Sequence, residues 1–284
     1  MSTTLESNVT DLWKRYENGL NAASATSEHR AVLDTFLDAL EAGEVRAAEP
    51  INSHGNGPEG WRVNEWVKRG VLLNFGLRET EARGHGGVDY HDVLPLRQTD
   101  DLGARGTRNT PNGTVLRRGS HLGADCIAMS PSFVNVGAYG DDGTLVDSCD
   151  VVGSCAQIGA NVKRGANTLV GGVLEPVEDA PVVIEDGASI GAGCRVVSGF
   201  HVGKDAVVGE NTLLTPRLPV YDLVEEAVTY GEIPAERRAF TRYVESSIGD
   251  HDLFAGGAYK PAVVAMDVAE DTRDATRREE ALRE

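Results

Sequence analysis

Basic residues, and lysine above all, are scarce in this sequence. The 284 residues include 27 Lys and Arg against 44 Asp and Glu, a formal net charge of -17, and only 5 of the basic residues are Lys. A nucleic-acid-binding protein needs basic surface to neutralise phosphates, so this balance argues against that class. Two explanations of the acidic excess stay open. One is a halophilic adaptation to a salty cytoplasm, where screening relieves self-repulsion; the other is a high-GC genome, which replaces Lys by Arg.

Cysteines and long apolar runs are also few. Four cysteines without a C-x-x-C pair argue against a disulfide-rich secreted module. The first twenty residues, "MSTTLESNVTDLWKRYENGL", lack the apolar core of a signal peptide, and no apolar run approaches membrane-spanning length. We therefore expect a soluble cytoplasmic protein, with one large core or one core and two smaller flanking domains.

The two ends of the chain differ in character from its middle. "HRAVLDTFLDALEAGE" has apolar residues at 32, 33, 36, 37 and 40, the spacing of one helix face, and "WRVNEWVKRGVLLNF" suggests a second helix. These segments predict a mostly helical N-terminal domain over 1–105. The tail combines the apolar run "PAVVAM" with the charged "EDTRDATRREEALRE", a solvated helix or a frayed end, which predicts a small C-terminal α/β segment over 220–284.

A six-residue period governs the middle of the chain. Apolar residues recur at every sixth position in two frames that differ in phase by two residues, and a small residue often follows four positions later. In the first frame only Gly140 and Arg164 are not apolar. The first frame reads Leu116, Leu122, Ala128, Val134, Gly140, Val146, Val152, Ile158, Arg164 and Val170; the second reads Ile184, Ile190, Val196, Val202, Val208 and Leu214; the small residues are Cys126, Ala156, Val162, Ala188, Cys194, Ala206 and Thr212.

This hexad repeat predicts a mainly β protein built on a left-handed parallel β-helix over residues 106–219. Each hexad supplies a short strand and a corner, and three hexads complete one turn of about 4.8 Å rise. The apolar residue points inward, and glycine suits the corners. The change of phase predicts a loop near 173–183 that leaves the repeat and returns. A β-sandwich would show a period of two instead.

The cysteines and glycine-rich patches fit the same repeat. Cys126 and Cys194 fall on the small inward position, where a thiol packs as a small hydrophobe. Cys149 and Cys155 share one register in neighbouring hexads, so we expect them on adjacent faces of the triangular turn. No His lies at metal spacing nearby, and no metal site is expected. "GASIGAGCRVV" follows the hexad frame and lacks the Lys of a phosphate-binding loop.

The residues between the frame positions of the repeat, and those of its loop, carry a family resemblance. "SFVNVGAYGDDGTLVDSCDVVGSCAQIG", followed by "GGVLEP" and "VVIEDGASIGA", closely resembles the tetrahydrodipicolinate N-succinyltransferases of the diaminopimelate route to lysine, and the stretch 131–176 is the specific part. "ALEAGEVRAAEP" and "WVKRGVLLNF" resemble the N-terminal domain of that family, and "YGEIPAERR" and "AYKPAVVAMDVAEDTRDATR" resemble its C-terminal segments more weakly.

The resemblance implies an acyl transfer. A succinyl group would pass from succinyl-CoA, a co-substrate and not a permanently bound cofactor, to the amino group of L-2-amino-6-oxopimelate, the ring-opened substrate. It also implies a homotrimer with active sites between subunits. Asp147 matches a substrate-contacting Asp of the family and is the expected proton acceptor, with Glu175 as the second acid. Asp147 could instead cap a corner, and Glu175 could merely end a loop.

Of the remaining site residues, only Arg108 is assigned through the resemblance, and the others follow from the chemistry that the reaction needs. Arg108 is the candidate for binding a substrate carboxylate, although it could be one of several solvated arginines. Backbone N–H groups at Gly153–Ser154 and at Gly171–Gly172 are candidate oxyanion donors, with Ser154 toward the substrate and the glycine pair toward the CoA thioester. Lys260 and Arg242 are candidates for the CoA phosphates.

Two departures from the family pattern keep other functions open. Where many members read S-E-V-V-E-G, this sequence reads "CRVVSG", with Arg195 and Ser198 in place of two acids, and the basic "VIVKKV" of the family reads "VVAMDV". Either another acid is the base, or the substrate or acyl group differs. An N-acetyltransferase on the same dicarboxylate and a non-catalytic β-helix scaffold are therefore the alternatives.

Overall fold

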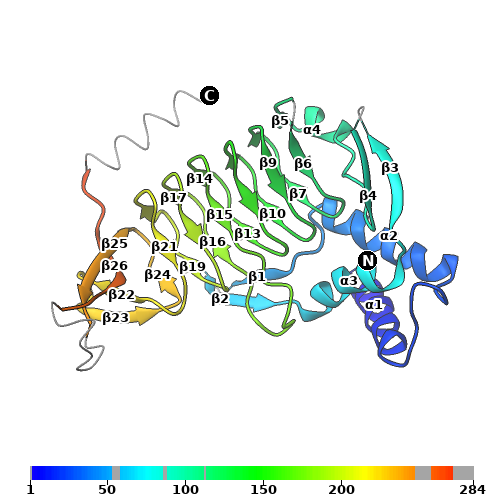
Figure 1. The fold of residues 1–284 in the computed structure, drawn as a ribbon, viewed down its shortest axis with the longest axis horizontal. Coiled ribbons are helices and arrows are strands. Elements are labelled where there is room, and N and C mark those ends of the chain that lie inside the picture. Colours follow the sequence, from blue (N-terminus) through cyan, green and yellow to red (C-terminus); the bar gives the residue numbers. More distant parts are fainter. Residues whose placement is uncertain (1, 53–57, 86–87, 112, 247–256, 271–284) are drawn as a thin grey trace.

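The protein is mainly β, with parallel sheets and a few helices. The computed structural model describes residues 2–52, 58–85, 88–111, 113–246 and 257–270. A regular stack of short strands fills the middle of the molecule, three helices lie at one end and along one side, and a strand layer closes the other end (Figure 1). Among the described residues, no helix is long and apolar enough to cross a membrane.

The N-terminal helices pack through the face that the sequence predicts. Helices α1 (Ser2–Glu17), α2 (Ser27–Glu41) and α3 (Glu65–Leu77) share one core cluster. Thr26 starts α2 with a capping box, accepting a hydrogen bond from the amide of His29. Leu33, Phe36, Leu37 and Leu40 are all buried, which confirms the predicted helix face.

Short hairpins and one more helix complete the N-terminal part. The second predicted helix begins only at Glu65, because the preceding residues form β2 (Pro58–Val63), antiparallel to β1 (Ala48–Asn52). Strands β3 (Glu81–His85) and β4 (Val88–Asp92) form a second hairpin, and α4 (Asp100–Ala104) leads into the strand stack.

The strand stack consists of strands of two or three residues each. Their bounds are β5 Arg108–Asn109, β6 Thr114–Leu116, β7 His121–Leu122, β8 Ile127–Ala128, β9 Ser132–Val134, β10 Tyr139–Gly140, β11 Leu145–Val146, β12 Val151–Val152, β13 Gln157–Ile158, β14 Lys163–Arg164, β15 Leu169–Val170, β16 Val183–Ile184, β17 Ser189–Ile190, β18 Arg195–Val196, β19 His201–Val202, β20 Val207–Val208 and β21 Leu213–Leu214. The chain forms no strand between β15 and β16, the stretch in which the sequence predicts a loop.

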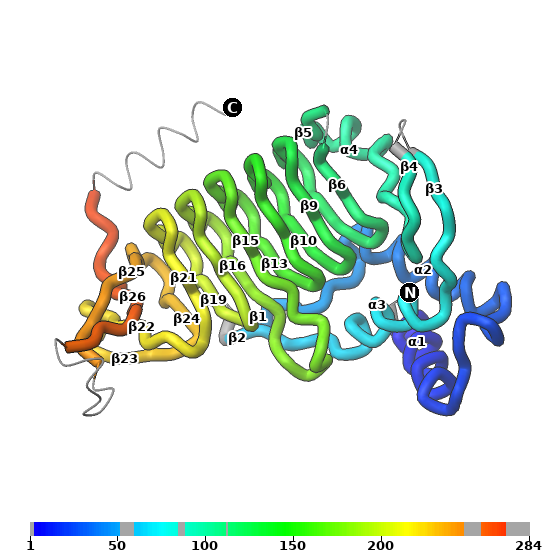
Figure 2. The backbone as a smooth tube through the Cα atoms, in the orientation of Figure 1, coloured from blue at the N-terminus to red at the C-terminus, as the bar shows by residue number. Residues whose placement is uncertain are grey.

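From β5 to β21 the strands pair in parallel with the strand three further along, except that β11 does not pair with β14, so three hexads make one turn, as predicted (Figure 2). The stack has three faces. The first face has the order β7-β10-β13-β16-β19-β24, and the second has the order β6-β9-β12-β15-β18-β21. The third face is divided into β5-β8-β11 and a sheet that starts with β14-β17-β20. We call the connections between faces corners.

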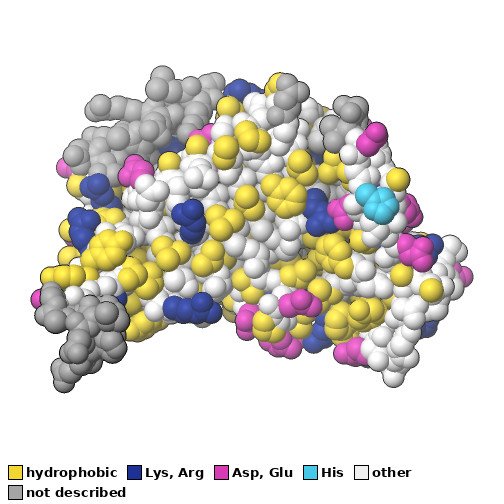
Figure 3. Space-filling model, viewed as in Figure 1, with side chains coloured by type: hydrophobic (Ala, Val, Ile, Leu, Met, Phe, Trp, Pro, Cys, Tyr) yellow, Lys and Arg dark blue, Asp and Glu magenta, His cyan; other side chains and the backbone are white. Residues whose placement is uncertain are grey.

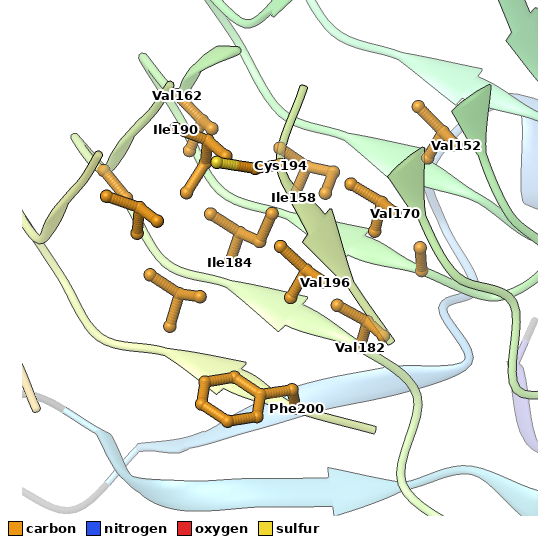
Figure 4. Packing of buried hydrophobic residues seen from close by; sticks show 14 of the residues in the cluster. Val152, Ile158, Val162, Val170, Val182, Ile184, Ile190, Cys194, Val196 and Phe200 are labelled. Carbon is orange, nitrogen blue, oxygen red and sulfur yellow. The ribbon is translucent and has the colours of Figure 1, made fainter. Parts of the chain in front are cut away.

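The interior of the stack confirms the hexad frame. Every residue of both frames is buried, and so are the seven small residues that follow them. Val152, Val170 and Val196 come from one face and Ile158 and Ile184 from another, and their side chains converge inside the stack (Figure 4). Arg164 is buried as well, at 1% exposure, although it is charged.

One column of corners alternates glycine with Asp or Asn. Gly143 and Gly187 have φ values of 70°, which a residue with a Cβ rarely adopts. A Cβ added to Gly143 would collide with Oδ1 of Asn161 in the next turn, and one added to Gly187 would collide with Oδ1 of Asp205. These glycines therefore provide the space that the side chain of the following turn occupies.

The C-terminal strands close the stack. Strand β24 (Glu232–Ile233) extends the first face, and β25 (Arg237–Glu245) extends the third. Strand β25 pairs with β26 (Tyr259–Asp267), which pairs with β22 (Pro219–Asp222) and, through it, with β23 (Ala227–Tyr230). The described tail is thus β structure. The expected charged helix falls almost entirely in 271–284, outside the described residues.

Candidate active site

Asp147 lies at the corner where the third face passes to the second, between β11 and β12. Its Oδ1 accepts a hydrogen bond from the amide of Ser148 at 2.7 Å, so the corner-capping contact considered for this residue is present. The amide of Asp147 donates to Oδ2 of Asp150 at 3.0 Å, and the amide of Asp150 donates to the carbonyl of Asp147 at 3.2 Å. The side chain is half-buried, and its Oδ2 has no hydrogen-bond partner among the described residues.

Asp150 and Arg164 lie directly beneath this corner, inside the stack. Burial raises the pKa of Asp150 to about 6, and the nearby Arg164 and the backbone donors offset this only in part. Burial lowers the pKa of Arg164. Neither residue was predicted as a site residue. The signal for the pair in the sequence is Arg164 itself, the one charged residue in the hexad frames.

Glu175 lies on the loop that leaves the stack at the corner between the second and first faces. The side chain is exposed, and the preceding Leu174 packs against the N-terminal core cluster. The buried Lys68 of α3 donates a hydrogen bond to the carbonyl of Asp179 near the end of the loop. Burial lowers the pKa of Lys68. The N-terminal helices therefore hold both sides of the segment that carries Glu175.

Gly153–Ser154 and Gly171–Gly172 meet at this same corner. The amides of Gly153 and Gly171 are used by the strand ladder, because they donate to the carbonyls of Val170 and Val196, each at 2.8 Å. A Cβ on Gly172 would lie 2.7 Å from the amide nitrogen of Ser154, so the two backbones require glycine to approach this closely. The amides of Ser154 and Gly172 make no hydrogen bond within the described residues, so they are the donors available to an oxyanion.

Arg108 lies at a third place, on the first strand of the third face. Its side chain is exposed and lines a groove of about 920 Å³ along the corner between the first and third faces. Lys163 and Lys204 add positive charge to the groove, and Asp125 and Asp186 add negative charge. Within one chain, therefore, Asp147 and Glu175 lie at two different corners, and Arg108 lies on a strand beside the third.

Arg242 and Lys260 lie far from these corners, at the C-terminal end. They occupy the antiparallel pair β25 and β26, and both are exposed. The guanidinium of Arg242 stacks on the ring of Phe240, with 4.0 Å from its carbon to the ring centroid.

Arg195 faces outward on the second face, at the position where the family pattern has an acid. It is exposed, its Nη1 donates to the carbonyl of Gly193 at 3.2 Å, and its register neighbours are Leu169 and Leu213. Ser198 is exposed at the next corner, with a φ of 58°. The rest of this outward column is apolar, and we call it the apolar column: Val115, Phe133, Val151, Leu169 and Leu213.

Three of the four cysteines are buried and pack inside the protein. Cys126 and Cys194 are buried at the predicted interior positions. Cys149 and Cys155 lie at the two corners that flank the second face, rather than on faces, and only Cys149 is exposed. Burial raises the pKa of Cys155 to about 12. Within the described residues, no group of three or more His, Cys, Asp or Glu could hold a metal ion.

The comparisons with known proteins cover the whole chain. Residues 4–77 match the family model for the N-terminal part of tetrahydrodipicolinate N-succinyltransferase. The chain is 35% identical over 287 residues to the 2,3,4,5-tetrahydropyridine-2,6-dicarboxylate N-succinyltransferase of Xylella fastidiosa (strain Temecula1 / ATCC 700964), covering 100% of this chain and 99% of that one. It is 36% identical over 289 residues to the enzyme of the same name from Polynucleobacter asymbioticus, covering 100% of both.

The stack has three strands per turn, one from each hexad, and its corners carry acidic side chains and glycines. This arrangement defines a protein of the hexapeptide-repeat class. Within that class, the chain belongs to the 2,3,4,5-tetrahydropyridine-2,6-dicarboxylate N-succinyltransferase family. A further relative with this name, from Dechloromonas aromatica (strain RCB), is 32% identical over 286 residues, which cover 100% of each chain.

Proposed function

We propose that this protein transfers the succinyl group of succinyl-CoA to the amino group of L-2-amino-6-oxopimelate, the ring-opened form of tetrahydrodipicolinate, in the diaminopimelate pathway of lysine biosynthesis. The observation that carries the proposal is the similarity, over the full length of both chains, to relatives named for this reaction. The reaction consumes a CoA thioester, so we expect the enzyme to work in the cytoplasm.

In the proposed reaction Asp147 is the general base. The substrate amine attacks the thioester carbonyl, a C–N bond forms, and Asp147 Oδ2 takes the proton that the nitrogen loses. The tetrahedral oxyanion is stabilised by N–H donors, for which the free amides of Ser154 and Gly172 are the candidates. The C–S bond then breaks, and the CoA sulfur leaves and is protonated to the thiol. Oδ1 of Asp147 accepts from the amide of Ser148, so Oδ2 is the oxygen left to accept the proton.

The active site is proposed to form between subunits of a homotrimer. Asp147 and Glu175 lie at the two corners that flank the second face, and the apolar column lies between them. If three copies turn their second faces toward a common axis, the Asp147 corner of each copy meets the Glu175 corner of the next. Hydrophobic side chains are spread across the middle of the molecule in Figure 3, with a few Lys and Arg side chains among them.

The other predicted residues receive proposed roles on the same basis. Arg108 would bind a substrate carboxylate, Gly171 and Gly172 would lie along the thioester, and Arg242 and Lys260 would contact CoA phosphates. The proposed architecture is the left-handed parallel β-helix of residues 106–219, between an N-terminal domain of 1–105 and a C-terminal segment of 220–284. The inward hexad frame and the three-face strand order support it.

A thiol-release assay tests the proposed function. Purified protein is mixed with the amino-oxo-dicarboxylate and either succinyl-CoA or acetyl-CoA, in low and in molar salt. We expect CoA release that depends on the acceptor and is much faster with succinyl-CoA. Faster release with acetyl-CoA would make the protein an acetyltransferase, and no release together with no CoA binding by calorimetry would favour the scaffold.

A further inference from the structure

The interior of the strand stack holds two opposite charges among inward side chains that are otherwise uncharged. Arg164 occupies an inward position of the hexad frame on β14, and Asp150 occupies the small inward position four residues after Val146. Each is 1% exposed. Removing two charges from water costs free energy that their attraction only partly offsets, so apolar residues would fill this layer at no loss of stability. The pair therefore calls for a role other than filling space.

The contacts between Arg164 and Asp150 are not those of a strong salt bridge. Nε of Arg164 lies 3.8 Å from Oδ2 of Asp150 and donates to the carbonyl of Leu145 at 3.3 Å. Nη1 and Nη2 of Arg164 are buried without a hydrogen-bond partner in the described residues. A strong Arg–carboxylate pair would be bidentate.

Asp150, by contrast, uses both carboxylate oxygens on backbone amides. Oδ2 accepts from the amide of Asp147 at 3.0 Å, and Oδ1 accepts from the amide of Thr168, in the next turn, at 2.8 Å. The buried carboxylate thus joins two consecutive corners of the stack, and one of them carries the candidate base.

The strand ladder of the third face is interrupted at this place. At matching corner positions the first residue after a strand donates to the next turn: Met129 donates to Val146 and Gly165 to Ile190, each at 2.8 Å. The amide of Asp147 would by this rule donate to the carbonyl of Arg164, but it donates to Asp150 instead. Accordingly β11 ends one sheet and β14 begins another.

We propose that the buried pair Asp150–Arg164 is a positioning device for Asp147: Asp150 takes the Asp147 amide out of the strand ladder and fixes the orientation of its side chain, and Arg164 keeps Asp150 in place. The inference rests on the proposed function, in which Asp147 is the base.

The geometry explains how such a device would act. The amide of Asp147 is held by Asp150, its carbonyl accepts from the amide of Asp150, and its Oδ1 accepts from Ser148. With these three points fixed, only Oδ2 is free to approach an amine. A base must be held within a fraction of an ångström of its productive position, and a displacement of about 1 Å can cost about 100-fold in rate.

The test replaces the pair by apolar residues. Asp150→Ala alone leaves a buried guanidinium without its carboxylate, and we expect a lower melting temperature. The double variant Asp150→Ala with Arg164→Leu restores an apolar interior, so the melting temperature should return to the native value or above it. We expect kcat for succinyl transfer to stay about 10-fold or more below native, with KM changed less, because Asp147 is no longer oriented.

A structural role alone predicts a different result, namely that the double variant regains kcat together with stability. That result would overturn the proposal. Thr212→Val is the matched control, because Thr212 is a buried polar residue in the same small inward register whose hydroxyl donates to the carbonyl of Gly209 at 2.6 Å, far along the chain from Asp147. Its kcat should stay native, and an equal loss there would also overturn the proposal.

A second variant serves if the double one does not fold. Asp150→Asn keeps the size of the side chain but offers one acceptor oxygen to the two amides of Asp147 and Thr168, so one of them loses its partner. We expect a folded protein with reduced kcat and faster exchange of the Asp147 amide; native values of both would contradict the proposal. The proposed function fails separately, if the native protein shows no succinyl transfer or if Asp147→Asn is fully active.

Discussion

Asp147 and Glu175 differ in how firmly the fold holds them. Asp147 lies on a corner of the stack with its backbone and one oxygen bonded, whereas the exposed Glu175 lies on a loop. We expect Asp147→Asn to lose about 100-fold or more in kcat, the usual contribution of a positioned base. Glu175→Gln should lose less, with more of its effect in KM, because a loop suits binding or gating. Steady-state kinetics of both variants check this.

The opposite kinetic pattern would reverse the two roles. If Asp147→Asn keeps near-native kcat while Glu175→Gln abolishes turnover, Glu175 is the base. Arg195 is not a candidate, because a guanidinium stays protonated and cannot accept a proton. Full activity in both carboxamide variants would place the base outside these motifs.

Asp150 should make stability depend on pH. Its folded pKa of about 6 is raised by burial above the value of about 3.9 expected in the unfolded chain. Its contribution to the free energy of unfolding is therefore fully present below about pH 4 and is lost as pH rises through about 6. Relative to Asp150→Asn, the native protein should lose about 1 kcal/mol of stability between pH 5 and pH 8. Urea unfolding of both proteins at each pH measures the difference. A difference that stays constant or grows with pH would show that the carboxyl ionises at its usual pH or below it.

At the level of elements, the contact between α3 and the Glu175 loop should control substrate affinity. Lys68 is buried and bonds the carbonyl of Asp179, so Lys68→Met removes a charged hydrogen bond worth about 2 kcal/mol and loosens the loop. We expect KM to rise about 3- to 10-fold while kcat changes less.

Lys14→Met is the control for this change. Lys14 lies on α1, and its side chain is 65% exposed in an ion pair with Asp11. Such surface pairs contribute little, so KM should stay native. If Lys68→Met lowers the melting temperature but leaves KM unchanged, the contact serves stability alone.

The hexad frame allowed the strand stack to be predicted almost residue by residue. Each inward position requires an apolar side chain, and such positions recur at every sixth residue. The frame also placed Cys126 and Cys194 in the interior and located the loop after Val170. The antiparallel pair of β1 and β2 was not predicted, because neither strand shows the alternation of apolar and polar residues that indicates a strand.

Much less of the candidate site followed from the sequence. Asp147 and Glu175 could be named from motifs, but their separation onto two corners depends on the three-face path of the chain. Asp150 was missed because its role rests on two backbone amides, one of them in the next turn, and no local spacing encodes that. For the same reason, the sequence could not show that the amides of Gly153 and Gly171 donate to the strand ladder, whereas those of Ser154 and Gly172 have no partner within the described residues.

For the whole molecule, assembly should depend on the apolar column. Leu169→Glu places a charge in the middle of the second face, and we expect a monomer without succinyl-transfer activity. Ile51→Glu, on β1 and 47% exposed, is the control and should stay trimeric. Light scattering reports the mass of each variant. A native protein that is monomeric and fully active would contradict the trimer.

The acidic surface gives a second prediction at this scale. If the charge of -17 is an adaptation to salt, the folded state repels itself in dilute buffer, and the melting temperature should rise steeply from low to molar potassium chloride. Scanning calorimetry in the salt series, with sucrose of equal osmolality as the control, separates screening from solvent exclusion. An essentially flat salt response would assign the charge to genome composition.

The alternation of glycine with Asp or Asn in one corner column gives the stack two kinds of turn, which follow one another along its axis. Asn161 occupies the space above Gly143, and Asp205 occupies the space above Gly187. Turns therefore come in pairs: a yielding turn, whose corner residue is glycine, is followed by a filling turn, whose Asn or Asp side chain occupies the space over that glycine. Removing a filling turn brings two glycines together and leaves only a gap. Removing a yielding turn sets one carboxyl or amide side chain against the Cβ of another, and the turns can no longer close to strand spacing. Natural or engineered lengthening of this repeat should therefore proceed by pairs of turns, and shortening by a single turn should be tolerated only where the filling member is lost.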